Sequence, residues 1–282
     1  MNRLLVLLPV LGAILTTQSA YANKQPNATS SSPSQKCVAL PWQARKAQWD
    51  VGQELPKFVE RAKVISALRP ASPPFDPSKS SKEEKTFNDG DAILGIGVKP
   101  WIYVPGTFIV VMETEKREPN SSGGYNSCEH ALDIGLIKQT NDGFTVLAKT
   151  EKPIKLEKRF RFNQFDLSPY KLSEKELAFG LQEASFAGVS GPTESIAMLD
   201  LYRNNNSKIE KVLSTPIIYE QQPANHVETA RVSVSPEKTD GYYNLAKTYK
   251  GKRCYFIWQK DKYSLNGQDT FANYVKGQGV DL

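Results

Sequence analysis

The chain has 282 residues, a formal net charge of +6, 39% hydrophobic residues and 10% aromatic residues. This apolar content excludes a chain that is disordered throughout, and β units of about 200–250 residues often fold as one domain. The sequence holds two histidines, so imidazole-based catalysis and histidine metal ligation are restricted to His130 and His226.

Residues 1–22 predict a secretory signal peptide. Arg3 supplies a positive charge, residues 4–15 are nearly all apolar, and Ala20-Tyr21-Ala22 fits the small-x-small cleavage pattern. The apolar run is shorter than the roughly 20 residues that span a bilayer. We therefore expect cleavage after Ala22, a periplasmic or secreted protein, no membrane span in the mature chain and no nucleic-acid partner.

The mature chain is predicted to begin with a flexible leader. Residues 23–36 are rich in Ser, Pro, Asn and Lys and have little to bury, so a single all-β domain is expected over residues 37–282. In residues 56–68 apolar side chains recur at three- and four-residue steps after Pro56, which predicts one short N-terminal helix. Residues 69–91 contain four prolines and a charged run, and they predict a long surface loop.

The remainder predicts short strands separated by turns. Residues 108–112 are apolar on both faces, which indicates an interior strand. An Asn-Asp-Gly turn at 141–143, three asparagines at 204–206 and Asp240-Gly241 each predict a β hairpin. The fold class is therefore all-β: an antiparallel meander of about ten strands, either a sandwich or an incomplete propeller, with one short N-terminal helix.

Three cysteines remain after signal cleavage. In an oxidising compartment an odd number predicts one disulfide and one leftover thiol, and the sequence leaves three pairings open. We prefer a bridge between Cys128 and Cys254, because it would tie the middle of the sheet to a late strand. Cys37 would then be the leftover thiol.

Fragments of catalytic patterns occur, but each is incomplete. Residues 188–192 contain a serine between glycines, yet they lack the last glycine and the strand–turn–helix context of a hydrolase elbow. Residues 128–130 place a thiol and an imidazole close together, but no second ligand pair follows. Whether the Glu129–His130 region binds metal therefore stays open.

Acidic residues in strands give no clear site either. Asp133, Asp166 and Asp200 lie in three different predicted strands, and a pair of carboxylates is what a glycosidase needs. Such acids occur in any strand-rich protein. The sequence thus predicts no catalytic residue, no cofactor and no metal ligand.

Basic and aromatic side chains mix near the C-terminus, as they do at protein interfaces and also at strand edges. The candidate binding residues are Tyr249, Lys250, Arg253, Tyr255, Lys262 and Tyr263. Segments 165–170, 178–181 and 255–258 resemble exported β proteins of proteobacteria, and this resemblance implies no activity.

We therefore expect an exported, non-enzymatic binding protein. It would be an inhibitor or immunity-type protein that acts on an envelope-targeting partner, with loops 69–91 and 115–128 as contact surfaces. The partner is an unknown protein or an anionic envelope polymer, which the positive charge allows. Two alternatives remain: an envelope hydrolase with a carboxylate-based site, and a binder of anionic envelope polysaccharide.

Overall fold

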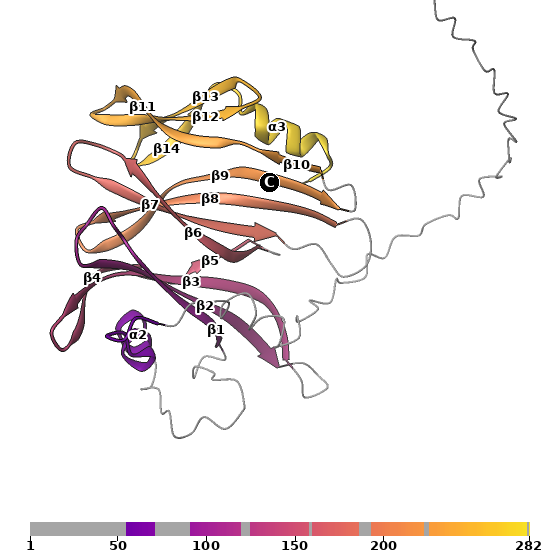
Figure 1. Ribbon diagram of the computed structural model, residues 1–282. Coiled ribbons are helices and arrows are strands. Elements are labelled where there is room, and N and C mark those ends of the chain that lie inside the picture. Colours follow the sequence, from indigo (N-terminus) through magenta and orange to yellow (C-terminus); the bar gives the residue numbers. More distant parts are fainter. Residues whose placement is uncertain are drawn as a thin grey trace, which may run out of the picture. The chain divides into compact units, whose positions relative to one another are not determined.

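Three antiparallel meanders of four strands each follow one another along the chain (Figure 1). The structure is a computed structural model, and it describes residues 55–70, 91–119, 125–157, 160–185, 193–222, 226–280 and 282. The first meander consists of β1 (Asp91–Pro100), β2 (Thr107–Pro119), β3 (Tyr125–Thr140) and β4 (Gly143–Lys149). The middle meander consists of β6 (Phe160–Lys171), β7 (Leu177–Ser185), β8 (Thr193–Asn205) and β9 (Lys208–Gln222). The third meander consists of β11 (Arg231–Thr239), β12 (Tyr242–Tyr249), β13 (Lys252–Gln259) and β14 (Lys262–Asn266).

Two sheets contain these strands. The first and middle meanders join into a ten-stranded sheet through a parallel contact between β4 and β9, at Lys149 and Lys208. Two short strands complete that sheet: β5 (Ile154–Lys155) beside β3, and β10 (His226–Thr229) beside β9. The third meander is a separate sheet of four strands.

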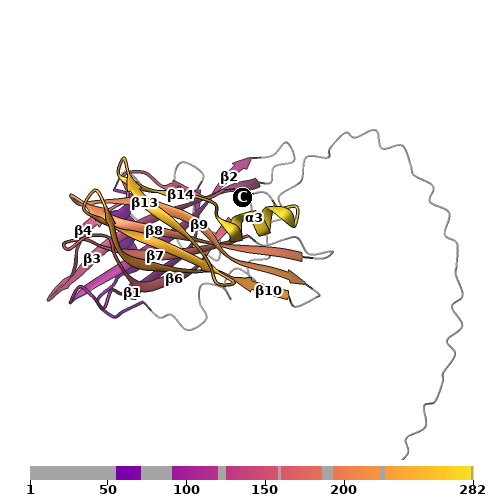
Figure 2. The same cartoon turned by 90° about the horizontal axis from the view of Figure 1, so that it is seen from above.

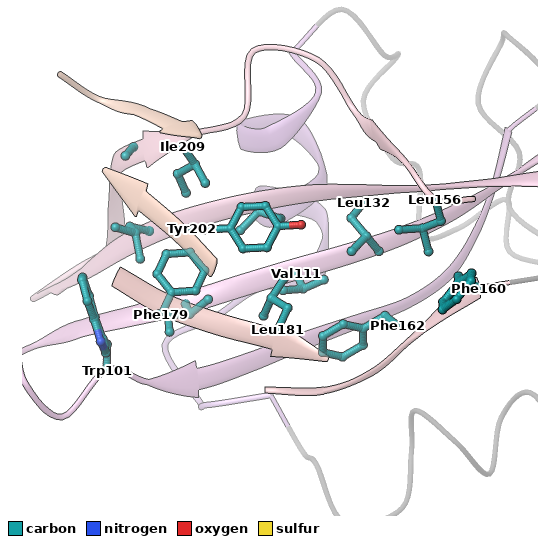
Figure 3. Close-up of a cluster of buried hydrophobic side chains, with 14 residues drawn as sticks. Trp101, Val111, Leu132, Leu156, Phe160, Phe162, Phe179, Leu181, Tyr202 and Ile209 are labelled. Atoms are coloured by element: carbon teal, nitrogen blue, oxygen red, sulfur yellow. The ribbon is translucent and has the colours of Figure 1, made fainter. Parts of the chain in front are cut away.

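The meanders pack face to face in layers. One cluster of buried side chains joins the first and middle meanders, and Figure 3 shows Phe179 and Tyr202 gathered with Val111 in it. A second cluster joins the middle and third meanders, through side chains such as Leu199 and Phe256. The middle meander is therefore covered on both faces, and its strands must be apolar on both.

Two helices close the ends of this arrangement. Helix α2 (Arg61–Leu68) packs Val64, Ile65 and Leu68 on the far side of the first meander. Helix α3 (Thr270–Gly277) packs Phe271 and Val275 beside β9 (Figure 2). Each helix has eight residues, and among the described residues no helix is long and apolar enough to cross a bilayer.

The all-β fold and the short N-terminal helix are confirmed. The interior strand is also confirmed, because β2 sends Ile109 and Val111 to one buried cluster and Val110 and Met112 to another. The hairpins at residues 204–206 and 240–241 are present, and their turns have the expected positive φ angles at four residues. Those angles are 50° at Asn206, 69° at Ser207, 52° at Asp240 and 83° at Gly241.

Three details differ from the sequence-based expectations. The described residues contain fourteen strands rather than about ten. The sequence predicted a single meander, whereas the structure has three meanders and two short additional strands. Helix α3 was not anticipated, since its eight residues are too few for a clear helical period. Residues 115–128 were expected to be a loop, but β2 and β3 run into this segment from both sides. The expected signal peptide, the expected leader and most of the expected loop 69–91 lie outside the described residues.

Candidate functional site

The six residues proposed as a binding surface divide between the two faces of the third meander. Successive strand residues point to opposite faces, and cross-strand partners share a face. Arg253, Tyr255 and Lys262 lie on the face turned away from the middle meander. Tyr249 and Tyr263 are each 6% exposed and belong to buried clusters on the opposite face. These two tyrosines therefore contribute to the core.

Lys250 lies in the turn between β12 and β13. Its Nζ donates to Glu228 Oε1 at 2.6 Å, and this contact raises the pKa of the Lys250 ammonium. Glu228 also stands 3.3 Å from the Nε2 atom of His226. Lys250 is thus already paired with a carboxylate, unlike the cations on the open face.

The outer face of the third meander is defined by the strand registers. It consists of Arg231, Ser233, Ala246, Thr248, Arg253, Tyr255, Ile257, Gln259, Lys262, Ser264 and Asn266. Their strand neighbours Leu245, Phe256 and Trp258 point inward and pack on the middle meander. The outer face is therefore one continuous surface, and six of its eleven side chains are exposed.

This outer face carries positive charge without acidic residues. Arg231, Arg253 and Lys262 are exposed, and none of them forms an ion pair with another described residue. Lysines elsewhere on the surface are commonly paired, as Lys171 is with Glu174 and Lys208 with Glu151. The charge on the outer face therefore stays uncompensated within the described chain.

The centre of the outer face is apolar. Tyr255 and Ile257 follow each other on one face of β13, and both side chains are partly exposed. Their cross-strand neighbours are small, with Ala246 opposite Tyr255 and Ser264 opposite Ile257. Small neighbours leave the phenol ring and the aliphatic chain accessible from outside.

A second group of interest is buried between the first and middle meanders. This carboxyl cluster consists of Glu113, His130, Glu183, Asp200 and Lys211. Glu113 Oε1 lies 3.3 Å from His130 Nδ1. On the side of the middle meander, Asp200 Oδ2 accepts from Lys211 Nζ at 2.5 Å and from the Tyr202 hydroxyl at 3.2 Å.

Glu183 is the unusual member of the carboxyl cluster. Burial raises the pKa of the Glu183 carboxyl to about 9, and the nearby charges of Asp200 and Glu113 add to this shift, while Lys211 opposes it. At neutral pH the Glu183 carboxyl is therefore protonated, and it lies close to the Asp200 carboxyl. A carboxyl that stays protonated near neutral pH is one of the two groups that acid–base hydrolysis requires.

Access to the carboxyl cluster is limited. Glu113, Glu183 and Asp200 are 1%, 6% and 0% exposed, whereas the Lys211 side chain is 32% exposed. A catalytic group must come within hydrogen-bond distance of its substrate. In this arrangement only Lys211 faces solvent to a substantial extent, so the acids serve mainly the contact between the two layers.

The strand acids noted from the sequence do not converge. Asp133 accepts from Arg69 Nε at 2.8 Å, which ties the end of α2 to the first meander. Asp166 accepts from the Tyr170 hydroxyl at 3.0 Å. Only Asp200 belongs to the carboxyl cluster. Sequence reasoning missed Glu113, Glu183 and Lys211, although charged residues in strands that are apolar on both faces are a usable signal.

A buried ion pair lies on the inner face of the third meander. Lys247 is 1% exposed, and its Nζ donates to Asp269 Oδ2 at 2.7 Å and to Thr215 Oγ1 at 2.9 Å. Asp269 also accepts from the backbone N–H groups of Phe271 and Ala272 at the start of α3. Burial lowers the pKa of Lys247, and Asp269 opposes that shift. The pair therefore holds α3 against β12 and β9.

Cys254 is a buried free thiol on β13. β13 belongs to the third meander and β3, which carries Cys128, to the first, with the middle meander between them. The expected bridge between Cys128 and Cys254 stays a prediction, because only one of its two sulfur atoms is described. Burial raises the pKa of the Cys254 thiol. The side chains of Cys37 and Cys128 lie outside the described residues, so Cys37 as the leftover thiol stays a prediction.

The Glu129–His130 region does not present a shared ligand pair. Glu129 is exposed and stands 3.3 Å from Lys155, while the adjacent His130 is buried against Glu113. Among the described residues, no group of three or more His, Cys, Asp or Glu side chains could hold a metal ion.

Comparison with known proteins adds no family. No protein family model matches the chain, and no curated protein or solved structure matches it. The functional argument therefore depends on the geometry described above.

Proposed function

We propose that this chain is an exported, non-enzymatic binding protein that acts on an envelope-targeting partner, as an inhibitor or immunity-type protein. The observation that carries this proposal is a difference in solvent exposure between two groups of charged side chains. Unpaired cations stand on the open outer face of the third meander, whereas the groups suited to acid–base chemistry are enclosed. A rigid sheet with an uncovered face suits recognition better than catalysis.

The layered core supports a stable display of that face. Leu245, Phe256 and Trp258 fix the third meander on the middle meander, and the Lys247–Asp269 pair holds its other end to α3. A contact surface on such a scaffold does not need to be ordered during binding. Less conformational entropy is then lost when a complex forms.

The test uses the mature chain, residues 23–282, immobilised and exposed to an envelope extract. The captured protein is purified, titrated with the mature chain, and assayed for its action on envelope material. We expect a one-to-one complex and an activity that falls in proportion to the bound fraction. A partner that keeps full activity when saturated contradicts the inhibitor or immunity-type role.

A second candidate is an envelope hydrolase based on the carboxyl cluster. The raised pKa of Glu183, which lies close to Asp200, favours this candidate, because acid–base hydrolysis needs a carboxyl that stays protonated near neutral pH. The mature chain alone would then release soluble fragments from envelope polysaccharide, and Glu183→Gln or Asp200→Asn would abolish the release. If the wild-type chain binds polysaccharide without cleaving it, the polysaccharide-binder alternative replaces both.

A further inference from the structure

We propose that the outer face of the third meander is the contact surface for the partner, and that the partner is a protein with an acidic rim around an apolar patch. This inference rests on the proposed binding function and names the partner's chemistry. It is carried by three features of the outer face: the positions of its cations, its apolar centre and its size.

The cations lie at opposite ends of the outer face. Arg231 and Arg253 flank Thr248 on neighbouring strands, so their backbones are about 10 Å apart. Lys262 pairs with Gln259, which is six residues along β13 from Arg253, a separation of about 20 Å. Two further exposed lysines lack ion pairs among the described residues: Lys252 begins the same strand, and Lys260 lies in the turn that follows it.

The space between these charges is occupied by Tyr255 and Ile257. An apolar centre surrounded by charged groups is the usual anatomy of a protein–protein interface, and tyrosine is enriched at the residues that dominate its affinity. Their cross-strand neighbours Ala246 and Ser264 have small side chains, which do not project above the sheet surface around Tyr255 and Ile257. An apolar side chain of a partner can therefore pack directly on the Tyr255 ring.

The size of the face limits the partner. Four strands about 4.8 Å apart and roughly 26 Å long cover about 500 Å². Stable protein interfaces bury about 800 Å² on each side. The partner must therefore also contact the residues that border the face, where Lys252 and Lys260 add positive charge and the turn after β13 also carries the exposed Asp261.

Other occupants fit less well. A flexible polyanion follows a continuous line of cations, but here about 20 Å of apolar and neutral residues separates Arg253 from Lys262. A second copy of this chain would place cations opposite cations, because the face carries no carboxylate. An acidic protein surface satisfies both the charge and the apolar centre.

Charge reversal tests the contact surface. The mature double variant Arg253→Glu with Lys262→Glu is compared with Lys138→Glu with Lys152→Glu, which reverses two exposed lysines of the first meander and its following turn. Affinities are measured by titration calorimetry for the partner isolated with the wild-type chain. We expect the outer-face variant to bind at least about 100-fold more weakly and the control within about threefold of wild type.

Two further measurements keep the result independent of charge alone. Tyr255→Ala is expected to weaken binding at least about tenfold at unchanged stability. A photo-crosslinking residue at Ser264 should join to the partner, whereas the same residue at Lys138 should not. Alginate, a carboxylated polysaccharide, serves as the polymer probe and is expected not to bind.

The outcomes separate the two proposals. If the outer-face variant binds the partner as tightly as wild type, the contact surface is wrong while the binding function stands. If the wild-type chain forms no complex with any envelope protein, the binding function fails and this inference falls with it. If alginate binds and the outer-face variant loses that binding, the partner is a polysaccharide and the acidic protein is wrong.

Discussion

The two faces of the third meander differ in whether their positively charged side chains are paired within the protein. On the inner face, Lys247 is buried and both of its hydrogen-bond acceptors are protein atoms, from Asp269 and Thr215. On the outer face, Arg253 and Lys262 have no ionic partner among the described residues. A cation whose ionic and hydrogen-bond partners lie within the fold contributes to stability. A cation without such a partner in the fold is available to another molecule. Substitutions at five positions test or extend this division.

The largest effect is expected at Asp269. Asp269→Ala leaves the Lys247 ammonium buried without its counterion and removes the N-cap of α3, so the free energy of unfolding should fall by about 3–5 kcal/mol. Asp269→Asn keeps a capping oxygen and should lose less. Urea denaturation at pH 7 measures both. Equal losses in the two variants would show that the ion pair, rather than the cap, holds α3.

Glu183→Gln extends the comparison to the buried acids. Folding keeps a proton on Glu183 that the unfolded chain releases above its ordinary pKa of 4.5, since the folded pKa is about 9. Stability therefore falls as pH rises through this window. Glu183→Gln should remove that dependence and stabilise the protein by about 2 kcal/mol at pH 7. Thermal unfolding followed from pH 4 to pH 9 tests it, and Glu176→Gln, in the turn before β7, serves as the control. A parallel pH profile in wild type and Glu183→Gln would refute the raised pKa.

A smaller effect is expected inside the third meander at Tyr263. Its hydroxyl donates to the backbone carbonyl of Tyr243 at 2.7 Å. Tyr263→Phe removes this hydrogen bond with little change of shape, so unfolding should become easier by about 1 kcal/mol. Chemical denaturation measures the change, and binding to the partner should stay the same. A loss of binding without loss of stability would place Tyr263 in the contact surface.

The smallest effect on stability is expected on the outer face itself. Arg253→Glu and Lys262→Glu replace exposed side chains without ion pairs, so each should change the free energy of unfolding by less than about 0.5 kcal/mol. Denaturation of the single variants checks this. A loss above about 1 kcal/mol would mean that these cations already serve the fold.

Local sequence patterns predicted the hairpin turns, but no pattern predicted which faces of distant strands pack together. The hairpin at Asp240-Gly241 follows from the conformational preferences of two adjacent residues. The carboxyl cluster, in contrast, joins Glu113 to Glu183 across 70 positions, and no local pattern shows which faces of two meanders will meet. Alternation also groups Arg253 with Tyr255, but it does not say whether that group or the one with Tyr263 faces outward. For tyrosine this matters, because its ring suits a core and its hydroxyl suits a surface.

The double covering of the middle meander has a consequence for how the chain folds. Side chains such as Leu199 and Leu201 are fully covered only once residues 231–266 are in place, because those residues form the layer above them. Before that layer is added, the middle meander exposes an apolar sheet face to solvent, and such intermediates aggregate readily. A chain truncated after β9 should therefore collect in inclusion bodies or bind to holdase chaperones, even though most of its strands are complete.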